Sequence, residues 1–238
     1  MGKMGKYAPL GTRIVPILRS SAELAETAGE RLFCPALHGH PPDCAEYLAL
    51  LPVQDSNGRL LAALAELRHG VPEGVCAGLL AVDPFRPAGP FLEALRRAGV
   101  RAVANFPTTA LFDGETGKTL HGVGLGPERE AAFLEQAADA GFSVTGFTAD
   151  AATGRRLRAA GAARLVVHPG AATGAPARDA GAAENAAAVA AELRREGGGP
   201  VLVYRPAGFE AHVAILAREA DGLVLLPDPP KNFQSSRL

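Results

Sequence analysis

The stretch VCAGLLAVDPFRPAGPFLEALRRAGVRAVAN, residues 75–105, contains the pattern that decides the fold. An apolar run over residues 75–81 is followed by a helical pattern at Phe91–Leu95 and by a second apolar run over residues 101–105. Both apolar runs are continuous rather than alternating, which is typical of parallel strands that are covered on both faces. We therefore interpret residues 75–105 as a strand, a helix and a second, parallel strand.

The same unit recurs along the whole chain. Strands are predicted at residues 13–18, 31–37, 75–81, 101–105, 142–146, 164–168, 201–204 and 223–226. Helical patterns are predicted at 91–95, 131–140, 153–160 and 183–196, and three of them end at a glycine suited to a left-handed C′ position, namely Gly99, Gly141 and Gly161. Eight strand–helix repeats in 238 residues predict a compact (β/α)8 TIM barrel, with residues 1–238 forming one domain. A doubly wound open sheet is the alternative, but its G-x-G-x-x-G motif is missing after the first strand.

Composition excludes several classes of function. The chain has a formal net charge of -1, whereas a nucleic-acid-binding domain is usually basic. A membrane span needs about 18–20 consecutive apolar residues, and no stretch approaches that length. The basic start of the chain is not followed by an apolar segment, so we expect no signal peptide. The 3 cysteines form no C-x-x-C pair, which favours a reducing, cytoplasmic location.

The end of the chain predicts an oligomer. After the eighth predicted strand only a short polar segment, Pro227–Leu238, remains, and it leaves no room for a full covering helix. We therefore expect this flank of the barrel to be covered by a second copy of the chain, so that the protein forms a homo-oligomer.

Polar side chains follow the predicted strands at the barrel end where active sites are built. Asp83 follows the third strand and is a candidate general base or Mg²⁺ ligand, although a carboxylate in a turn is its ordinary structural role. Asn105 ends the fourth strand and is a candidate donor to an oxyanion, or else a turn-capping amide. His168 ends the sixth strand and is a candidate acid or base near neutral pH, unless it is satisfied locally.

Further residues at these loops are candidates for substrate binding. Three arginines, Arg19, Arg86 and Arg205, are able to hold a carboxylate or phosphate through two hydrogen bonds, although a single arginine is more often ion-paired at the surface. Thr108 follows Asn105 in the loop after the fourth strand. His38 and His40 have the spacing of a metal pair but lack a third ligand.

Other catalytic arrangements are absent from the sequence. It contains no G-x-S-x-G nucleophile elbow and no Walker A motif. Cys76 lies within an apolar run, where core packing is the expected role.

The middle of the chain resembles the phosphoenolpyruvate hydrolase-like family of TIM-barrel proteins, which is itself similar to the carboxyl-terminal part of the plant antiviral Tm-1 proteins. The resemblance covers roughly residues 72 to 174 and rests on Ala77-Gly78, Asp83-Pro84-Phe85, Asn105-Phe106-Pro107-Thr108, Leu111-Phe112-Asp113-Gly114, Gly124-Leu125-Gly126, His168, Gly170 and Thr173-Gly174. It implies a TIM barrel with a pocket formed by strands three, four and six. The loops differ from the family pattern after the first, second and seventh strands.

Taken together, these features predict an enzyme that acts on a small anionic 2-oxo or enol acid, phosphorylated or not, as a hydrolase or a lyase. Asp83, Asn105 and His168 are then the catalytic residues, with Mg²⁺ as the candidate metal. The alternative is a non-catalytic barrel that binds a metabolite or a protein partner, as relatives of the family suggest. Under the first hypothesis, the substitution Asn105→Ala lowers turnover and leaves folding intact.

Overall fold

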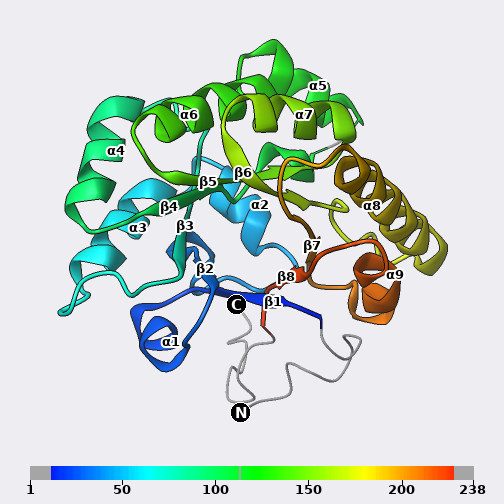
Figure 1. The fold of residues 1–238 in the computed structure, drawn as a ribbon, viewed down its shortest axis with the longest axis horizontal. Helices are drawn as coiled ribbons and strands as arrows, with labels where there is room; N and C mark the ends of the chain where they lie inside the picture. The colour runs from blue at the N-terminus through cyan, green and yellow to red at the C-terminus, as the bar shows by residue number, and fades with distance from the viewer. Residues whose placement is uncertain (1–11, 113, 228–238) are drawn as a thin grey trace.

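Eight parallel strands in the described part of the chain, residues 12–112 and 114–227, close into a barrel (Figure 1). The structure is a computed structural model. The strands are β1 (Ile14–Leu18), β2 (Arg31–Phe33), β3 (Val75–Leu79), β4 (Ala102–Asn105), β5 (Ser143–Thr148), β6 (Ala162–Val167), β7 (Val201–Arg205) and β8 (Leu223–Leu225). Each strand pairs with the next, and β1 pairs with β8 through Ile14 opposite Leu223, which closes the ring. The predicted (β/α)8 barrel is confirmed.

Most of the helices form the outer layer of the barrel (Figure 1). The α-helices are α1 (Ser21–Glu26), α2 (Ala45–Leu50), α3 (Ser56–Ala65), α4 (Ala88–Arg97), α5 (Gly114–Gly122), α6 (Pro127–Asp139), α7 (Ala151–Ala159), α8 (Pro176–Glu196) and α9 (Val213–Ala217). Short 3-10 turns are η1 (Pro35–Leu37), η2 (Thr109–Leu111) and η3 (Glu210–His212). The three glycines predicted to end helices all have positive φ, at 94° for Gly99, 85° for Gly141 and 91° for Gly161.

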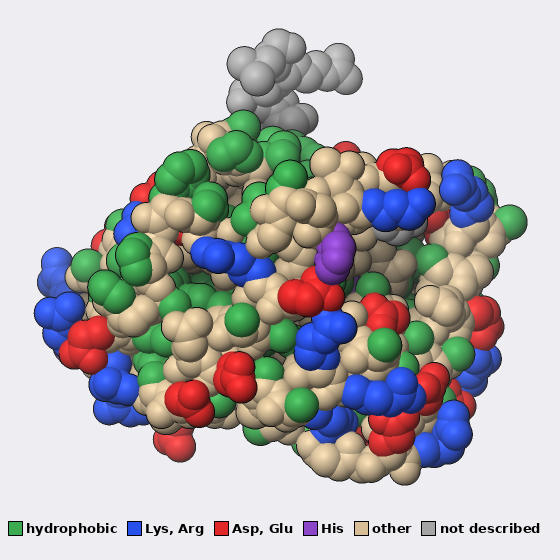
Figure 2. Space-filling model, turned by 90° about the horizontal axis from the view of Figure 1, so that it is seen from above, with side chains coloured by type: hydrophobic (Ala, Val, Ile, Leu, Met, Phe, Trp, Pro, Cys, Tyr) green, Lys and Arg blue, Asp and Glu red, His purple; other side chains and the backbone are tan. Residues whose placement is uncertain are grey.

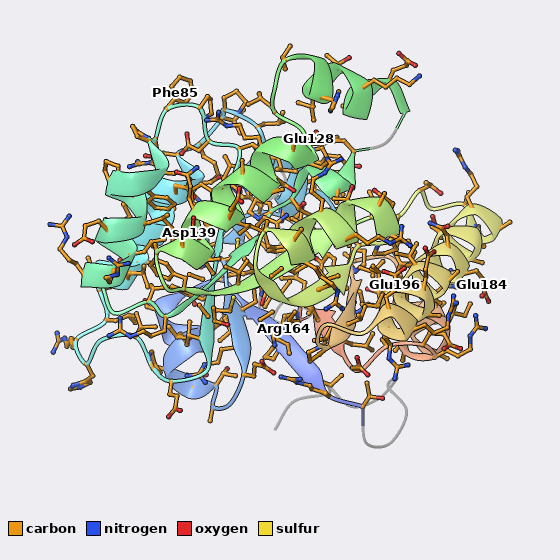
Figure 3. The ribbon with its side chains drawn as sticks, turned by 45° about the horizontal axis from the view of Figure 1, so that its top comes forward. Phe85, Glu128, Asp139, Arg164, Glu184 and Glu196 are labelled. Carbon is orange, nitrogen blue, oxygen red and sulfur yellow. The ribbon has the colours of Figure 1, made fainter. Side chains whose placement is uncertain are left out.

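Two buried layers result from the alternation of side chains along the strands. Val103 belongs to the apolar layer between strands and helices, whereas its neighbour Ala104 belongs to the layer inside the barrel. Arg164 occupies the end of the barrel opposite the candidate site, where it pairs with Glu30 and donates to Thr145 Oγ1 (Figure 3). Because active sites lie at the other end, these polar contacts serve the stability of the barrel.

The sequence predictions were wrong in three loops. The predicted strand 31–37 stops at Phe33, because Pro35 starts the 3-10 turn η1 and has no N–H for a strand ladder. The stretch from Phe106 to Gly126 reads as irregular in the sequence but contains η2 and α5. Likewise, α8 begins at Pro176, well before the predicted residue 183.

The segment between β2 and α3 closes the carboxyl end of the barrel. Its elements η1 and α2 place Ala36, Leu37, Ala45 and Ala49 in the same buried cluster as the interior residues Phe106, Phe147 and Tyr204. In Figure 1, α2 lies within the outline of the ring of strands. The axis of the barrel is therefore filled by the chain itself rather than open to solvent.

Two expectations concern surfaces and neighbours of the barrel. None of the helices in the described ranges combines the length and apolar character needed to cross a membrane. The segment on which the oligomer prediction rests, residues 228–238, lies outside the described residues. Homo-oligomer formation therefore stays a prediction, which the molar mass from light scattering will check.

Candidate functional site

Asn105 is buried and links β4 to β5 and α6. Its Nδ2 donates to Glu130 Oε2 at 2.8 Å and to the Phe147 carbonyl at 3.1 Å, and its Oδ1 accepts from the Phe147 N–H at 2.7 Å. Asn105 is the last residue of β4, so its side-chain amide continues the pairing with β5 beyond the end of the strand. The amide that the sequence suggested as an oxyanion donor is thus engaged within the protein.

Glu130 on α6 is the acidic group that this network holds, and the sequence did not single it out. It is 2% exposed and accepts from Asn105, from Thr108 Oγ1 at 2.9 Å and from the Thr109 N–H at 2.8 Å. The structure therefore brings together Asn105 and Thr108, two of the predicted site residues, around a carboxyl group at the carboxyl ends of β4 and β5.

Burial sets the protonation of Glu130. The loss of water around this carboxyl raises its pKa to about 7, although the hydrogen bonds from Thr109, Asn105 and Thr108 act in the opposite direction. A carboxyl group with a pKa near neutrality exists in both forms at physiological pH. Glu130 is consequently able to accept or donate a proton there.

A cavity of about 370 Å³ opens beside Glu130. It lies between the loops that follow β4 and β5, and it is lined by Thr109, Ala110, Phe112, Gly114, Gly117, Lys118, Leu120, Gly126, Pro127, Glu130, Phe147, Ala149, Asp150 and Thr153. Helix α5 contributes several of these residues but has no buried side chain of its own, and Figure 3 shows it standing above the barrel. The cavity therefore has a lightly packed cover.

The Thr109 hydroxyl is a polar group without a hydrogen-bond partner in this cavity. Its oxygen is buried and makes no hydrogen bond of ordinary geometry to any described residue, although it lies close enough to lower the pKa of Glu130. A buried hydroxyl that lacks a partner costs about 1–3 kcal/mol.

His168 lies in a separate network, inside the mouth of the barrel. It is 1% exposed, its Nδ1 accepts from the Gly170 N–H at 2.9 Å, and its Nε2 lies 3.0 Å from Glu46 Oε2. The other Glu46 oxygen accepts from Tyr204 OH at 2.6 Å. Both ring nitrogens of His168 are thus engaged by the protein, under the cover of α2.

Asp83 belongs to a third network, at the loop after β3. Its Oδ2 accepts from Asn57 Nδ2 at 3.0 Å and lies 3.6 Å from Arg86 Nε, and its Oδ1 accepts from the Phe85 N–H at 2.9 Å. These partners of Asp83 include neither Asn105 nor His168. The three predicted catalytic residues therefore sit in three different hydrogen-bond networks.

The predicted arginines all have acidic partners. Arg19 pairs with Glu23 at 3.4 Å, Arg86 pairs with Asp55, and Arg205 pairs with Glu210 at 2.7 Å. Arg205 also donates to the Leu226 carbonyl at 3.1 Å. A substrate anion at any of these arginines would compete with a carboxylate of the chain.

The surroundings of Asp83 do not suit a divalent metal in this conformation. Among the described residues, no three His, Cys, Asp or Glu side chains come together as ligands. Asp83, the predicted Mg²⁺ ligand, already accepts from an amide and a backbone N–H and faces Arg86. These donors and the positive charge of Arg86 stabilise the carboxylate and disfavour a cation beside it. His40 contacts Gln54 Oε1 at 3.2 Å rather than His38.

Two of the three cysteines are buried, which excludes them as nucleophiles in this conformation. Burial raises the pKa of Cys34 far above its ordinary value, and it raises that of Cys76 to about 11, whereas Cys44 is partly exposed.

We expect iodoacetamide to alkylate Cys44 in the native protein at least about tenfold faster than Cys34 or Cys76, because the reagent attacks accessible thiolate. Peptide mass spectrometry measures the three rates, and rapid modification of Cys34 would contradict this structure of the mouth.

A second prediction concerns stability and pH. The folded state holds the Glu130 proton more tightly than the unfolded chain, whose carboxyl keeps the ordinary value of 4.5. Protonation of Glu130 therefore adds about 3 kcal/mol to the free energy of unfolding below pH 4.5. This stabilisation is lost as the pH rises through about 7. Denaturant unfolding between pH 5 and 8 will measure it. The free energy of unfolding should change less with pH in Glu130→Gln than in the wild type. An equal pH dependence in both proteins would contradict the raised pKa of Glu130.

Comparison with known proteins places these residues in a family. The family model described as "Phosphoenolpyruvate hydrolase-like" matches residues 43–195, which is more than half of the chain. The chain belongs to this family. The matched range contains Glu46, Asp83, Asn105, Glu130 and His168, whereas Arg19 and Arg205 lie outside it.

Relatives of this phosphoenolpyruvate hydrolase-like chain occur in bacteria and plants. The uncharacterized protein y4oT of Sinorhizobium fredii (strain NBRC 101917 / NGR234) is 37% identical over 145 residues, which cover 58% of this chain and 71% of that protein. The tomato mosaic virus (ToMV) resistance protein Tm-1(GCR237) of Solanum lycopersicum is 35% identical over 122 residues, which cover 51% of this chain. The match spans 16% of the Tm-1 protein, so most of Tm-1 has no counterpart here.

Solved structures support the fold. A protein of Burkholderia cenocepacia J2315, described provisionally as a phosphonomutase, aligns with a TM-score of 0.52 at 16% identity, covering 90% of this chain and 84% of that one. The tryptophan synthase alpha-subunit of Pyrococcus furiosus aligns with a TM-score of 0.50 at 17% identity, covering 90% and 86%. At these sequence identities the similarity supports the barrel fold and gives no information about activity.

Proposed function

We propose that this phosphoenolpyruvate hydrolase-like barrel is an enzyme that transfers a proton to or from a small anionic 2-oxo or enol acid, with Glu130 as the acid/base. The observation that carries the proposal is a buried carboxyl group with a pKa of about 7 beside a cavity of about 370 Å³. Asn105 and Thr108 are positioning residues, because they act on the substrate through Glu130.

The size and lining of the cavity support a small acid as the substrate. A volume of about 370 Å³ lies at the lower end of the range for ligand pockets. Lys118, which also pairs with Glu115 at 2.7 Å, and the N-terminal end of α6 line it and attract a negatively charged group, whereas Asp150 opposes one. In this proposal the Thr109 hydroxyl, which is buried beside Glu130 and makes no hydrogen bond of ordinary geometry, rotates to donate to the substrate's carbonyl oxygen.

The proton transfer follows from this arrangement. The Glu130 carboxylate takes a proton from the carbon next to the substrate carbonyl, and the electrons of the broken C–H bond form the enolate double bond. The negative charge develops on the carbonyl oxygen, where the Thr109 hydroxyl donates a hydrogen bond. Return of the proton from Glu130 to the same carbon regenerates the 2-oxo acid and the Glu130 carboxylate.

Proton exchange with solvent tests the proposal without knowledge of the full reaction. Pyruvate and 2-oxobutyrate are incubated with the protein in D₂O, and the loss of the C3 proton signals is followed by NMR. We expect saturable exchange faster than in buffer, and the same rate with or without added Mg²⁺, because Asp83 does not form a metal site. Exchange at the buffer rate for both acids between pH 6 and 8 would overturn the proposal.

A second candidate function is a barrel that binds a protein partner, and one feature favours it. A cavity of about 660 Å³ beside the loop after β3 is lined largely by apolar residues, and Phe85 at its edge is 81% exposed (Figure 3). Large exposed apolar side chains beside a cavity are typical of interaction sites. The exchange experiment discriminates the two hypotheses, because a binding module has no reason to accelerate it.

A further inference from the structure

The mouth of the barrel contains a carboxylate that the proposed reaction does not use. Glu46 lies on α2, is 6% exposed, and its side chain enters the interior cluster of the barrel. Removing a carboxylate from water is costly unless it is well hydrogen-bonded. The partners of Glu46 therefore decide whether this arrangement is favourable.

Two donors from neighbouring strands converge on the Glu46 carboxylate. Tyr204 of β7 donates to Oε1 at 2.6 Å, and burial together with the adjacent carboxylate raises the pKa of Tyr204 further above its ordinary value, so the phenol keeps its proton. His168, which follows β6, lies 3.0 Å from Oε2 through Nε2. Because its Nδ1 accepts from the Gly170 N–H, the imidazole carries its proton on Nε2 and donates it to Glu46.

Aromatic side chains surround these two donors and suit the apolar part of a small organic acid. The ring of Tyr204 lies 5.0 Å from that of His168, 5.4 Å from that of Phe106 and 6.2 Å from that of Phe147. Tyr204 and Phe147 lie within β7 and β5, and His168 and Phe106 directly follow β6 and β4. The strands of the barrel and the residues that follow them thus surround the Glu46 carboxylate, which α2 carries.

Helix α2, which carries Glu46, buries few apolar side chains completely, although its Tyr47 packs edge-on against Phe112 with 5.6 Å between the ring centroids. Helix α2 has six residues, and its buried side chains besides Glu46 are Ala45 and Ala49. A helix this short has little stability of its own, and an alanine buries less apolar surface than larger aliphatic side chains. The two hydrogen bonds of Glu46 therefore help to keep α2 in the mouth, together with the Tyr47–Phe112 ring contact and the hydrogen bonds from Gln54 and Ser56 to carbonyls of α2.

We infer that Tyr204 and His168 form a binding site for the carboxylate of a small free organic acid, and that Glu46 occupies this site in the present conformation. An acid that binds there displaces Glu46 and with it α2. The site is distinct from the cavity at Glu130, and the inference involves none of the residues proposed for proton transfer.

Chemical rescue tests the site directly. Glu46→Ala removes the side-chain atoms that acetate replaces, and acetamide is the neutral molecule of the same shape. We expect acetate to raise the melting temperature of Glu46→Ala in a saturable manner, and acetamide to have a much smaller effect. In the double variant Glu46→Ala/Tyr204→Phe, acetate binding should be about tenfold weaker, because one hydrogen bond to a charged group is lost.

The remaining variants keep the inference falsifiable. Glu46→Gln fills the same space, so acetate should not stabilise it, and it reports whether position 46 tolerates substitution. If Glu46→Ala folds only in the presence of acetate, the yield of folded protein on refolding with acetate or with acetamide replaces the melting temperature as the measurement. Equal effects of acetate and acetamide, or equal acetate binding with and without the Tyr204 hydroxyl, would overturn the inference.

The wild-type protein provides an independent readout of displacement. Cys34 is fully buried in the cluster that α2 covers, so its alkylation reports opening of the mouth. We expect pyruvate to increase the rate of Cys34 modification by iodoacetamide at least about threefold, and acetamide to leave it unchanged. A rate that does not respond to pyruvate or acetate at any concentration would contradict competition between a free acid and Glu46.

Discussion

Replacing Glu130 with glutamine is expected to slow the protein-catalysed exchange of 2-oxo acid protons by about 10²–10⁴-fold, the usual contribution of a general acid or base. The substitution removes the proton-accepting oxygen while keeping a similar shape. In the wild type, the exchange rate should rise with pH and level off above about 7, because the carboxylate form of Glu130 is the base. The variant should lose this inflection.

The chain offers a matched control for this experiment. Glu128 lies two residues earlier on α6, but it is at the surface and pairs with Arg156 and His121 (Figure 3). Glu128→Gln should therefore retain wild-type exchange. Glu130→Asp, which withdraws the carboxyl group by one methylene, should retain partial activity, and it keeps the test valid if the amide of Glu130→Gln disturbs folding. Wild-type rates in Glu130→Gln would remove this residue from the mechanism.

The substitution Asn105→Ala is expected to lower the free energy of unfolding by about 3–5 kcal/mol, in the range found when a buried polar network is broken. It leaves the N–H and the carbonyl of Phe147 without their side-chain partner and removes a donor from Glu130. Each buried group left without a partner costs about 1–3 kcal/mol. Denaturant unfolding at pH 7 measures the change.

This expectation replaces the one made from the sequence, in which Asn105→Ala changed turnover and left folding intact. Gln136→Ala is a suitable control, because Gln136 lies on the same helix as Glu130 and its amide bonds locally to the Ala132 carbonyl. We expect it to change stability by less than about 0.5 kcal/mol. A similarly small effect of Asn105→Ala would show that the network contributes little.

The barrel was predictable from the sequence because continuous apolar runs and Gly-terminated helices are local signals. The strand predicted at residues 164–168 and the helix predicted to end at Gly161 correspond closely to β6 (Ala162–Val167) and to the end of α7. The segment at 35–50 was not predictable in this way. Its strand-like composition continues past Pro35, and the placement of α2 depends on contacts with strands that are distant in sequence.

The candidate site was predictable only in part, for the same reason. Asn105 and Thr108 follow a strand, so the rule for barrel loops identifies them. Glu130 lies within a helix, where an acidic residue usually faces solvent. One signal was available: Glu130, Leu134 and Ala137 follow the helical repeat of the buried face of α6. An acidic residue on an apolar face is a candidate for a buried functional carboxyl group.

His168 and Asp83 illustrate what position at a strand end does not determine. Both lie where the sequence placed them, but their side chains are engaged by Glu46 and by Asn57, whose sequence positions gave no indication of contact. The partner of a buried polar group depends on the packing of the loops. That information is not contained in the strand–helix repeat.

The most direct test of the account is the titration of the Glu130 carboxyl itself. Carbon-13 NMR of protein labelled at the glutamate side-chain carboxyl, with Glu130→Gln used to assign the resonance, follows this group from pH 4 to 9. Burial of Glu130 beside its cavity predicts a midpoint at about 7. A midpoint near the ordinary value of 4.5 would contradict it, because the carboxyl would then be fully ionised at neutral pH and would lack the property on which the proposed proton transfer rests.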